Sequence, residues 1–521
     1  QDSKGLNVEE LSTHLAPFSV QRATILGLIK VFEHIKIFGS LIQIPYQIKT
    51  QLAVLPKVLT LVKQSGDMYA SSAADDLLPL VQQAQLLAMQ FDAVVANPPY
   101  MGGKYLTPIL KSYLKDNFKG FEKDLFSAFM IRNLNFTKSS GQLGFMSPFV
   151  WMFISSYEEL RRNLIDNATL TSLVQLEYSG FDGATVPICT FTIAKQHFSK
   201  FLGSYIRLSD FRGSDLQGPK TLEAIKNPEC GWFHSAKPDD FKKIPGSPIA
   251  YWISNRAREN YLGCKLLGDI SQPRQGMATT DNKRYLRLWH EVPNQKIAFG
   301  CHSAAEGNNI GRNWFPYNKG GEFRKWYGNN DFVIYYEKGG EALIDMVREK
   351  YPRISDPEFV IKNRKYYFKP SVTWSYISSA YFGVRVSDAG FIFDVAGSSI
   401  FPDEDQRFWI ASLMVSKVAS YYLKAINPTL NFQVENISAI PVLDSELDPF
   451  KPELTTLAKS AVSIARSDWD SEETSWDFLV DPLVALGVQA TQLESSWYKR
   501  QAGLLQAFKN LKDIEENSNQ I

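Results

Sequence analysis

The sequence has 521 residues, of which 44% are hydrophobic and 13% aromatic, and its charges balance at a formal +1. A chain of this length is long enough for about two or three domains, and the balanced charge means that any basic, nucleic-acid-binding surface must be local. No apolar run approaches the roughly 20 residues of a membrane span, and the amino terminus shows no signal peptide, so we expect no membrane partner.

Residues 15–90 have the apolar spacing of helices, interrupted near SLIQIPYQ (40–47) and QSGDMYASS (64–72). Few glycines precede residue 91, and none belongs to a G-x-G loop of the kind that cradles a nucleotide-like cofactor. We therefore predict a helical first segment, residues 1–90, without a cofactor-binding loop.

The stretch FDAVVANPPYMGG (91–103) begins as an apolar, β-branched run and ends abruptly in Asn97, Pro98, Pro99 and Tyr100. The run has the composition of a buried central strand of a parallel sheet. In open α/β sheets ligands bind beyond the carboxyl ends of the strands, so these four residues lie where a site is expected. A proline-stiffened turn with no further role is the alternative interpretation.

The chemistry of these four residues favours a site. A conjugated amine is a poor nucleophile because its lone pair is delocalised, and two acceptors aimed at its N–H groups hold it in a more nucleophilic geometry. Asn97 Oδ1 and the Pro98 carbonyl are candidate acceptors, because prolines fix φ and remove competing donors. Tyr100 offers a flat face for stacking. The tetrapeptide is thus predicted to clamp a planar amine.

Helices and strands are predicted to alternate after this loop. Residues 121–137 and 156–168 have helical spacing, and the second stretch opens on a serine cap with carboxylates in its first turn. This order predicts a doubly wound α/β sheet that ends in an antiparallel hairpin. The expected strands lie in GQLGFMSP (141–148), LTSLVQLEYSG (170–180) and ICTFTIAKQ (188–196), with Phe181 and Asp182 between the last two.

N-P-P-Y after an apolar strand resembles the catalytic motif of amino-methyltransferases that use S-adenosylmethionine, among them DNA adenine-N6, RNA guanine-N2 and release-factor glutamine enzymes. The resemblance implies that residues 91–240 form the later half of a class I (Rossmann-like) methyltransferase sheet. The glycine-rich cofactor loop of such folds is then expected upstream of this chain. A degenerate, inactive methyltransferase is the alternative.

From about residue 265 to 430 the sequence is rich in aromatics, glycine and short strand-like runs, with Arg, Lys, Tyr and Trp interleaved. This composition suits nucleic acid, because cations meet phosphates and rings meet bases. The segment KNRKYYFK (362–369) has four basic residues and no acid, which makes it the clearest basic patch. An ordinary β-rich domain with solvated lysines is the alternative. Amphipathic helices are predicted from about residue 448.

The cysteines and histidines give no sign of a metal site. The four cysteines are scattered without C-x-x-C spacing, and the six histidines form no ligand pair at helical or ribbon spacing. We therefore predict reduced thiols in a cytoplasmic protein and no metal.

Six segments carry a closer resemblance. They are, in order, NPPYMGG, GFMSPFVWMFISSYEELRRNL, RQGMATTDNKRYLR, NKGGEFRKWYGN, TWSYISS and NPTLNFQVENISAIPV. Together they resemble the PglX family, the adenine-specific DNA methyltransferases of BREX phage-defence systems, over residues 30–445. The resemblance implies a methyltransferase followed by a mixed α+β target-recognition domain (265–445), which reads a short asymmetric DNA site, and a helical carboxy-terminal region (448–521).

The resemblance also implies roles for single residues. Asn97, Pro98, Pro99 and Tyr100 match the catalytic motif. Asn97, Asp124 and Phe126 match positions beside the cofactor, although Asp124 to Phe126 also fit a simple helix start. Trp326 is expected in the core. The candidate DNA contacts, each with a structural role as the alternative, are Arg274, Gly276, Thr279, Asn282, Arg284, Arg324, Lys325, Lys362, Arg364 and Lys365.

The implied reaction begins with flipping of an adenine out of the duplex. The base then stacks on Tyr100, and Asn97 and Pro98 hold its N6 amine for in-line transfer of the methyl group of S-adenosylmethionine. No general base is needed, because the methylated amine is transiently acidic. The implied role is to mark host DNA as self, with double-stranded DNA, other BREX proteins and phage-encoded DNA-mimic inhibitors as partners.

Three other functions stay open. A release-factor glutamine methyltransferase would not need the long aromatic-rich second half. A bifunctional restriction enzyme would carry a nuclease centre, and no convincing P-D…E-x-K pattern occurs here, although one could lie upstream. A non-catalytic DNA-recognition subunit of a defence complex is the non-enzyme alternative, and binding of a cofactor analogue to the full-length protein would separate it from the enzyme.

Overall fold

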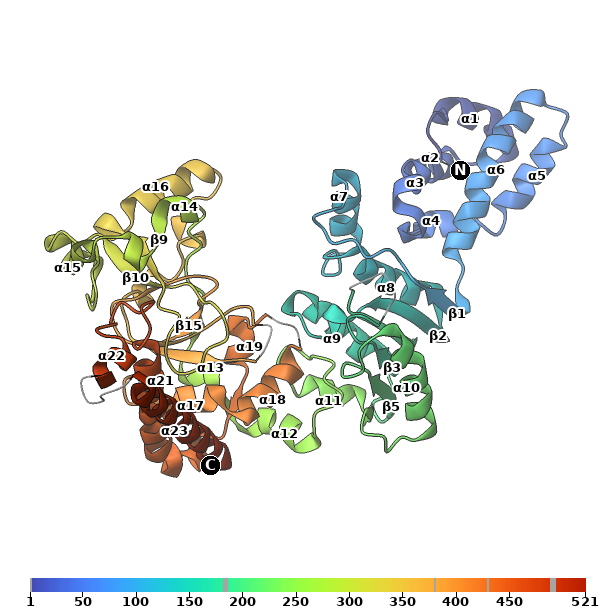
Figure 1. Cartoon of the computed structure of the whole chain (residues 1–521). Helices are drawn as coiled ribbons and strands as arrows, with labels where there is room; N and C mark the ends of the chain where they lie inside the picture. Colours follow the sequence, from blue (N-terminus) through green and yellow to red (C-terminus); the bar gives the residue numbers. More distant parts are fainter. Residues whose placement is uncertain (1, 181–185, 379–380, 429–430, 488–492) are drawn as a thin grey trace. The chain divides into compact units, whose positions relative to one another are not determined.

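The computed structural model describes residues 2–180, 186–378, 381–428, 431–487 and 493–521. The chain divides into two compact units, Gln1–Trp252 and Ile253–Ile521 (Figure 1). Among the described residues no helix is both long and apolar enough to cross a bilayer.

A helical bundle forms the beginning of the first unit (blue in Figure 1). Its core consists of fully buried apolar side chains such as Leu15, Ile25 and Leu77. Both predicted interruptions are present, at 42–45 and 64–67, but the helices are also interrupted at 16–21, 33–34 and 50–54, so this segment is helical with more turns than predicted. The helices are α1 (Val8–Leu15), α2 (Arg22–Phe32), α3 (Ile35–Phe38), α4 (Tyr46–Lys49), α5 (Leu55–Lys63) and α6 (Met68–Ala88).

A six-stranded sheet forms the rest of the first unit, in the order β1-β2-β4-β3-β5-β6. β1 and β2 are parallel, β3 and β5 are parallel, and β4 and β6 are antiparallel to their neighbours, so most strands run in one direction. The predicted antiparallel hairpin is confirmed as β3 and β4, while Phe181 and Asp182 lie outside the described residues. The strands are β1 (Phe91–Ala96), β2 (Thr137–Pro148), β3 (Thr169–Gln175), β4 (Ile188–Ala194), β5 (Gly203–Arg207) and β6 (Phe233–Ala236).

Helices cover both faces of this sheet. Leu173 of β3 and Tyr205 of β5 lie in one core with α8 (Leu125–Phe136) and α9 (Glu158–Asn167). Their neighbours Val174 and Ile206 point to the other face, because side chains alternate along a strand, and pack with Ala224 of α10 (Ser214–Lys226). The predicted doubly wound arrangement is therefore present. The unit also contains α7 (Pro108–Asn117) and α11 (Pro238–Lys242).

A buried arginine joins the helical bundle to the sheet. Arg132 of α8 donates hydrogen bonds to the carbonyl oxygens of Ser40 (2.9 Å), Ile42 (2.6 Å) and Leu87 (2.9 Å). Burial lowers the pKa of Arg132 to about 10. These bonds fix the bundle to the helix that starts beside the Asn97 loop.

Two predictions in this unit were wrong in detail. β1 was predicted as a buried central strand, but it is an edge strand on which Val95 is 85% exposed. Within the described residues β1 pairs only with β2, and only its other face, with Val94 and Ala96, packs on the core. The predicted serine cap of α9 is also absent, because Ser155–Tyr157 forms a 3₁₀ turn and Tyr157 precedes the helix without a side-chain cap bond.

The second unit combines two four-stranded sheets, β14-β10-β11-β9 and β13-β12-β15-β8, with the short pair β7 and β16. Trp326, Trp374 and Trp409 are buried in its largest core, so the prediction for Trp326 is confirmed. The strands are β7 (Lys265–Leu266), β8 (Pro273–Arg274), β9 (Leu286–Leu288), β10 (Trp314–Asn318), β11 (Phe332–Tyr335), β12 (Ser371–Trp374), β13 (Val384–Ser387), β14 (Ile392–Phe393), β15 (Ser399–Ile400) and β16 (Pro441–Val442).

Helices dominate the end of the second unit, as predicted. Its helices are α12 (Asn255–Gly263), α13 (Leu267–Ile270), α14 (Asn282–Tyr285), α15 (Ala304–Asn309), α16 (Glu341–Lys350), α17 (Arg407–Val415), α18 (Lys417–Ile426), α19 (Val434–Ser438), α20 (Asp444–Leu447), α21 (Lys451–Trp469), α22 (Pro482–Gly487) and α23 (Leu493–Gln520).

The basic segment KNRKYYFK (362–369) lies in the region where short strands were predicted, but it does not form a strand. Asn363 (φ 58°) and Phe368 (φ 67°) adopt left-handed backbone conformations that an extended strand excludes. Between them Arg364–Tyr366 forms a 3₁₀ turn, and the next strand, β12, begins at Ser371.

Candidate active site and nucleic-acid interface

The Asn97 loop follows directly on β1, at the carboxyl edge of the sheet. Asn97 is exposed and Pro98 is buried, while the ring of Tyr100 is half-buried against the core. The Tyr100 hydroxyl donates a hydrogen bond of 2.8 Å to Asn97 Oδ1. Burial raises the pKa of Tyr100, so it remains a neutral donor. The structure therefore brings together the two side chains predicted to clamp an amine.

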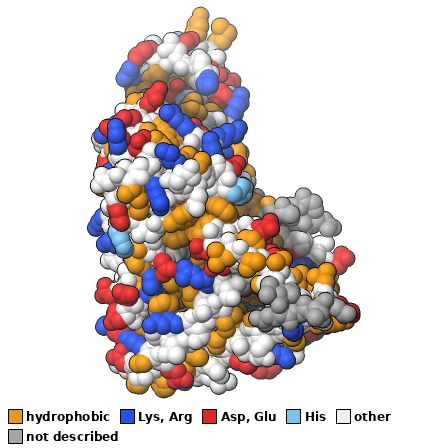
Figure 2. Space-filling view, turned by 60° about the vertical axis from the view of Figure 1, so that its left-hand side comes forward, with side chains coloured by type: hydrophobic (Ala, Val, Ile, Leu, Met, Phe, Trp, Pro, Cys, Tyr) orange, Lys and Arg blue, Asp and Glu red, His pale blue; other side chains and the backbone are white. Residues whose placement is uncertain are grey.

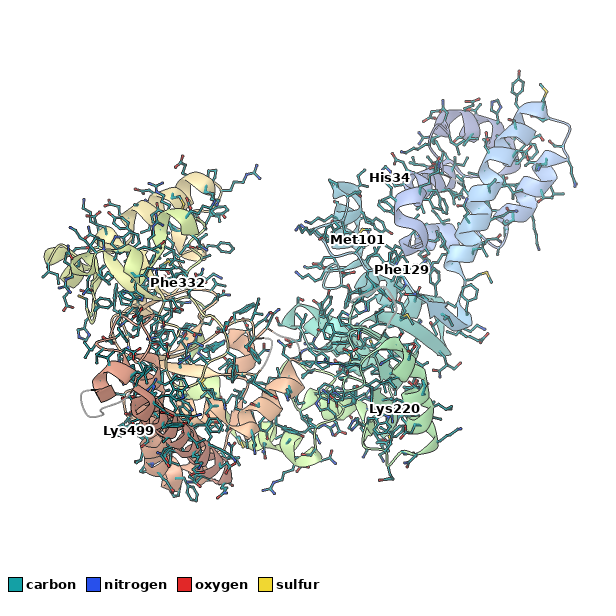
Figure 3. The ribbon with its side chains drawn as sticks, viewed as in Figure 1. His34, Met101, Phe129, Lys220, Phe332 and Lys499 are labelled. Carbon is teal, nitrogen blue, oxygen red and sulfur yellow. The ribbon has the colours of Figure 1, made fainter. Side chains whose placement is uncertain are left out.

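Asp124 anchors the chain immediately after this loop. As the cap of α8, its Oδ1 accepts hydrogen bonds from the backbone N–H groups of Phe126 (3.3 Å) and Met101 (3.1 Å). Figure 3 labels Met101 beside the start of α8 and Phe129 on that helix. Burial raises the pKa of Asp124. Asp124 thus has the predicted helix-start role and also positions the loop, while Phe126 is buried beneath it.

Aromatic side chains missed in the sequence gather at the same edge of the sheet. The Tyr157 ring lies 5.5 Å from Phe126, and burial, with Asp124 nearby, raises the pKa of Tyr157. Tyr178, which is 43% exposed, meets Phe149 edge to face at 5.6 Å. Phe149 and Tyr178 closely follow the ends of β2 and β3, which is the signal that could have identified them.

The structure brings two distant basic segments together in the second unit. The guanidinium of Arg274 lies 5.1 Å from the centre of the Tyr366 ring, and the ammonium groups of Lys365 and Lys369 lie 5.4 and 5.5 Å from it. Lys362 donates a 2.7 Å hydrogen bond to Gln275 Oε1. Segments almost 90 residues apart in sequence thus form one local basic cluster.

Arg364 is partly engaged in holding this cluster. Its side chain donates hydrogen bonds to the Tyr336 hydroxyl (3.3 Å) and to the Gly339 carbonyl (3.1 Å). Gly276, another predicted contact, has a structural reason to be glycine, because a Cβ there would lie 2.0 Å from the Phe393 carbonyl oxygen.

A polar loop carries three further predicted contacts. Thr279 is buried and donates its hydroxyl hydrogen to Asn282 Oδ1, while Asn282 and Arg284 are exposed. Asp281 caps α14 by accepting a 3.1 Å hydrogen bond from the Arg284 N–H. The loop therefore presents Asn282 and Arg284 to solvent from a fixed backbone.

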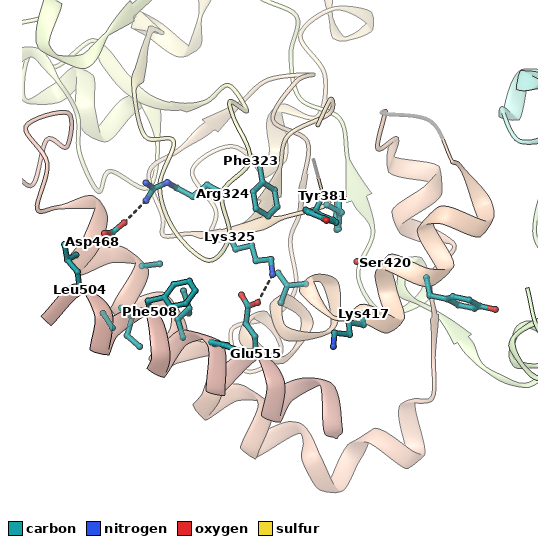
Figure 4. A pocket seen from close by; sticks show the side chains of 18 of the residues that line it. Phe323, Arg324, Lys325, Tyr381, Lys417, Ser420, Asp468, Leu504, Phe508 and Glu515 are labelled. Carbon is teal, nitrogen blue, oxygen red and sulfur yellow. Dashed lines mark hydrogen bonds and ion pairs between the residues drawn. The ribbon is translucent and has the colours of Figure 1, made fainter. Parts of the chain in front are cut away.

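Arg324 and Lys325 lie elsewhere, on a cavity of about 940 Å³ beside α21 and α23 (Figure 4). Arg324 pairs with Asp468 at 3.5 Å, and Lys325 pairs with Glu515 at 2.7 Å. Glu515 also accepts a 2.9 Å hydrogen bond from the buried Trp326 indole. These two cations are thus tied to the helical region.

Surface charge is mixed on the face drawn in Figure 2, where Lys and Arg side chains are interspersed with Asp and Glu. This agrees with the formal net charge of +1. Any nucleic-acid-binding surface of this chain would therefore have to be local.

Comparison with known proteins shows which protein families this chain resembles in sequence. Residues 48–181 match the Eco57I restriction-modification methylase family. Over 511 residues, 96% of this chain, the sequence is 34% identical to the adenine-specific methyltransferase BrxX of Escherichia coli O9:H4 (strain HS). The chain is a relative of the BrxX and PglX adenine-specific methyltransferases. Its identity to PglX of Lacticaseibacillus casei (strain Zhang) is 33% over 455 residues, which confirms the predicted resemblance to the PglX family.

The match covers only part of these relatives. The chain spans 39% of the length of BrxX, although 96% of the chain is aligned, and 37% of PglX, with 86% aligned. The fold is also similar to that of the Type IIL restriction-modification enzyme MmeI in complex with DNA, with a TM-score of 0.50 and 12% identity, covering 99% of this chain and 74% of MmeI. This second likeness concerns the fold alone.

Proposed function

We propose that the full-length protein is an S-adenosylmethionine-dependent, site-specific DNA adenine-N6 methyltransferase that marks host DNA in phage defence. The Asn97–Tyr100 pair carries the proposal, because it sits at the carboxyl edge of the sheet within the methylase-matching residues 48–181. The kinship with BrxX and PglX supports adenine as the methylated base.

Asn97, Pro98 and Tyr100 hold the substrate in this proposal. The adenine leaves the duplex, because its amine is inaccessible within the base stack. It stacks on the Tyr100 ring, and Asn97 Oδ1 and the Pro98 carbonyl accept hydrogen bonds from the N6 amine. These two acceptors orient the lone pair of the nitrogen toward the methyl donor, and the proton leaves after transfer.

The described residues fit part of a cofactor site. When bound, S-adenosylmethionine supplies the methyl group. Asp124 Oδ1 accepts the Met101 and Phe126 N–H groups, and in this proposal the carboxylate of Asp124 also faces a positively charged amine of the cofactor. Phe126 supports this wall from the core. Asn97 completes the wall toward the reacting amine.

We assign the rest of the cofactor site to a part of the full-length protein outside this chain. The chain covers 39% of BrxX, and the residues before β1 contain no G-x-G loop. β1 is the last strand at one edge of the sheet, and we infer that the sheet of the full-length protein continues from this edge. One face of β1 is also uncovered, since Val95 on that face is 85% exposed. Exposure of an apolar strand is unfavourable, so we infer that another part of the full-length protein packs on β1. This favours a partial methyltransferase fold over a degenerate, inactive one.

Residues 265–445 read the DNA site in this proposal, and the helices after residue 448 support them. Arg274, Lys365 and Lys369 around Tyr366, together with Lys362 beside Gln275, provide phosphate contacts. Other BREX proteins, and phage-encoded DNA mimics that imitate the phosphate charge, are the proposed protein partners.

Sequencing of host DNA with and without the gene tests this proposal. We expect N6-methyladenine at one short asymmetric site only when the gene is present. Unmodified adenine in the presence of the expressed full-length protein and its defence partners would contradict it.

A further inference from the structure

A polar cleft of about 430 Å³ lies in the second unit, where two parallel strands end. β10 and β14 pair in register as Tyr317 with Ile392 and Asn318 with Phe393. The next residues in each chain segment, Lys319 and Asp394, are therefore side by side on the cleft. The polar loop 278–283 forms the opposite wall.

Lys319 is held by a buried carboxylate. Asp394, whose side chain is 5% exposed, accepts hydrogen bonds from the Lys319 ammonium (2.6 Å), the Tyr317 hydroxyl (2.6 Å) and the Ala396 N–H (2.7 Å). An ammonium group has three donors, and the structure records one of them in use. Lys319, at 24% side-chain exposure, thus offers further donors to the cleft from a fixed position.

The facing loop also presents a donor. Asn282 Oδ1 accepts the Thr279 hydroxyl, so the amide NH₂ is the polar group that Asn282 can turn to a ligand. The loop backbone is held by Lys350, which donates to the Thr280 carbonyl at 3.1 Å, and Thr280 adopts a left-handed φ of 55°, unusual for a β-branched residue. Two walls of the cleft therefore offer hydrogen-bond donors.

We propose that this cleft binds the acceptor edge of a guanine in the DNA site, with Lys319 as a residue that determines sequence specificity. This inference rests on the proposed DNA-reading function. The major-groove edge of guanine presents two acceptors, O6 and N7, and lysine is one of the usual partners of that pair. Adenine presents an amine at the same place, which would oppose the donors of Lys319 and Asn282.

Charge separates this role from a phosphate contact. Asp394 neutralises Lys319, so Lys319 adds little to the release of counterions on DNA binding, whereas its donors keep their direction. Lys283, exposed on the rim of the same cleft, has the properties of a phosphate contact. Lys319 should therefore govern which sequence is bound, and Lys283 how binding depends on salt.

The test compares the full-length wild-type protein with Lys319→Gln, Lys319→Arg and the matched control Lys283→Gln. Each protein selects from a randomised duplex DNA library, and the selected DNA is then bound over a salt series. Lys319→Gln should lose the preference for guanine at one position, with discrimination falling about 5- to 150-fold, at an unchanged salt slope. Lys319→Arg should keep the preference. Lys283→Gln should keep the sequence preference and reduce the slope by about one unit.

Asn282→Asp covers the case in which Lys319→Gln does not fold, as judged by thermal melting. Asn282 is exposed, and exchanging its donor for an acceptor should also weaken guanine selection. An unchanged preference in the folded variants, or a uniform loss of affinity with a lower salt slope in Lys319→Gln, would overturn the inference. A wild-type protein that methylates adenine without selecting guanine would overturn this inference and leave the proposed methyltransferase function standing. Guanine selection that depends on Lys319, without adenine methylation, would instead overturn the proposed function.

Discussion

The Tyr100 hydroxyl donates a 2.8 Å hydrogen bond to Asn97 Oδ1, so the oxygen proposed to hold the adenine amine already has a partner within its own loop. An amide oxygen has two lone pairs, so Asn97 Oδ1 can accept the incoming amine as a second hydrogen bond. The bond from Tyr100 keeps the amide oriented before the base arrives. The Tyr100 ring and its hydroxyl therefore have separable effects.

Tyr100→Phe and Tyr100→Ala separate these effects in the full-length protein. The phenylalanine ring still stacks, so methylation should stay within about tenfold of wild type, the size of one hydrogen bond. Alanine removes the stacking surface, worth about 1–3 kcal/mol per base, so kcat/KM should fall about 5- to 150-fold. Equal losses in the two variants would mean that the hydroxyl, and not the ring, is required.

Asp124→Asn and Asp124→Ala distinguish the loop-positioning role from a cofactor role. Burial raises the pKa of Asp124 above 3.8, so the folded state disfavours the carboxylate at neutral pH. The ionised carboxylate therefore makes an unfavourable contribution to the free energy of folding. This contribution is absent below pH 3.8 and develops as the pH rises through the raised pKa of the folded state. Asparagine removes the charge but keeps the acceptor Oδ1. It should therefore be at least as stable as wild type at pH 7 and equal to it near pH 3.8.

Alanine at the same position should lose about 1 kcal/mol, because the cap of α8 and the bond to Met101 are lost. Chemical denaturation at the two pH values measures both effects. If Asp124 also binds a cationic cofactor group, the stable asparagine variant should lose methylation. A stable and fully active asparagine variant would leave Asp124 with the structural role alone.

Val95 tests whether the sheet continues beyond β1. In the 521-residue chain Val95 is 85% exposed, so Val95→Lys should leave its melting temperature unchanged. In the full-length protein the same change should lower the melting temperature and weaken S-adenosylmethionine binding, because a lysine would then be buried. Calorimetry should also show poor cofactor binding by the shorter chain. Micromolar affinity in that chain would contradict the assignment of the glycine-rich loop to another part of the protein.

Much of the fold could be predicted from local patterns. The strands at 141–148 and 188–196 were found because apolar runs and turn residues mark their ends. The exposure of β1 could not be predicted, since the pattern FDAVVA shows which side chains favour burial and not whether a neighbouring strand is present. The serine cap of α9 failed because the serines closed a competing 3₁₀ turn.

The candidate site was only partly visible in the sequence. The Asn97 loop was recognisable from contiguous residues. Tyr157 and Tyr178, in contrast, reach this edge of the sheet from turns and loops, through ring contacts with Phe126 and Phe149 that one sequence does not reveal. Similarly, Lys325 was a candidate DNA contact implied by the family resemblance. Its partner Glu515 lies 190 residues away, a distance over which charge pairing cannot be inferred from one sequence.

Removal of charge at Lys362, Arg364 and Lys365 tests the basic cluster. Glutamine at all three positions should weaken DNA binding and reduce the log–log salt slope by roughly one unit per lost phosphate contact. The matched control replaces three exposed lysines of α23, Lys499, Lys509 and Lys512, which should leave the slope unchanged. An unchanged slope in the folded first variant would mean that the cluster around Tyr366 is only a solvated surface.

The rate of N6-methyladenine formation by full-length Asn97→Ala tests the central claim most directly. Asn97 is exposed and acts on the amine, so its loss should lower the rate by at least about 10²–10³, while DNA binding and the melting temperature stay at wild-type values. Asn135→Ala, at an exposed asparagine of α8 in the same unit, is the matched control and should methylate normally. Wild-type methylation by a folded, DNA-binding Asn97→Ala variant would contradict the assignment of the active site.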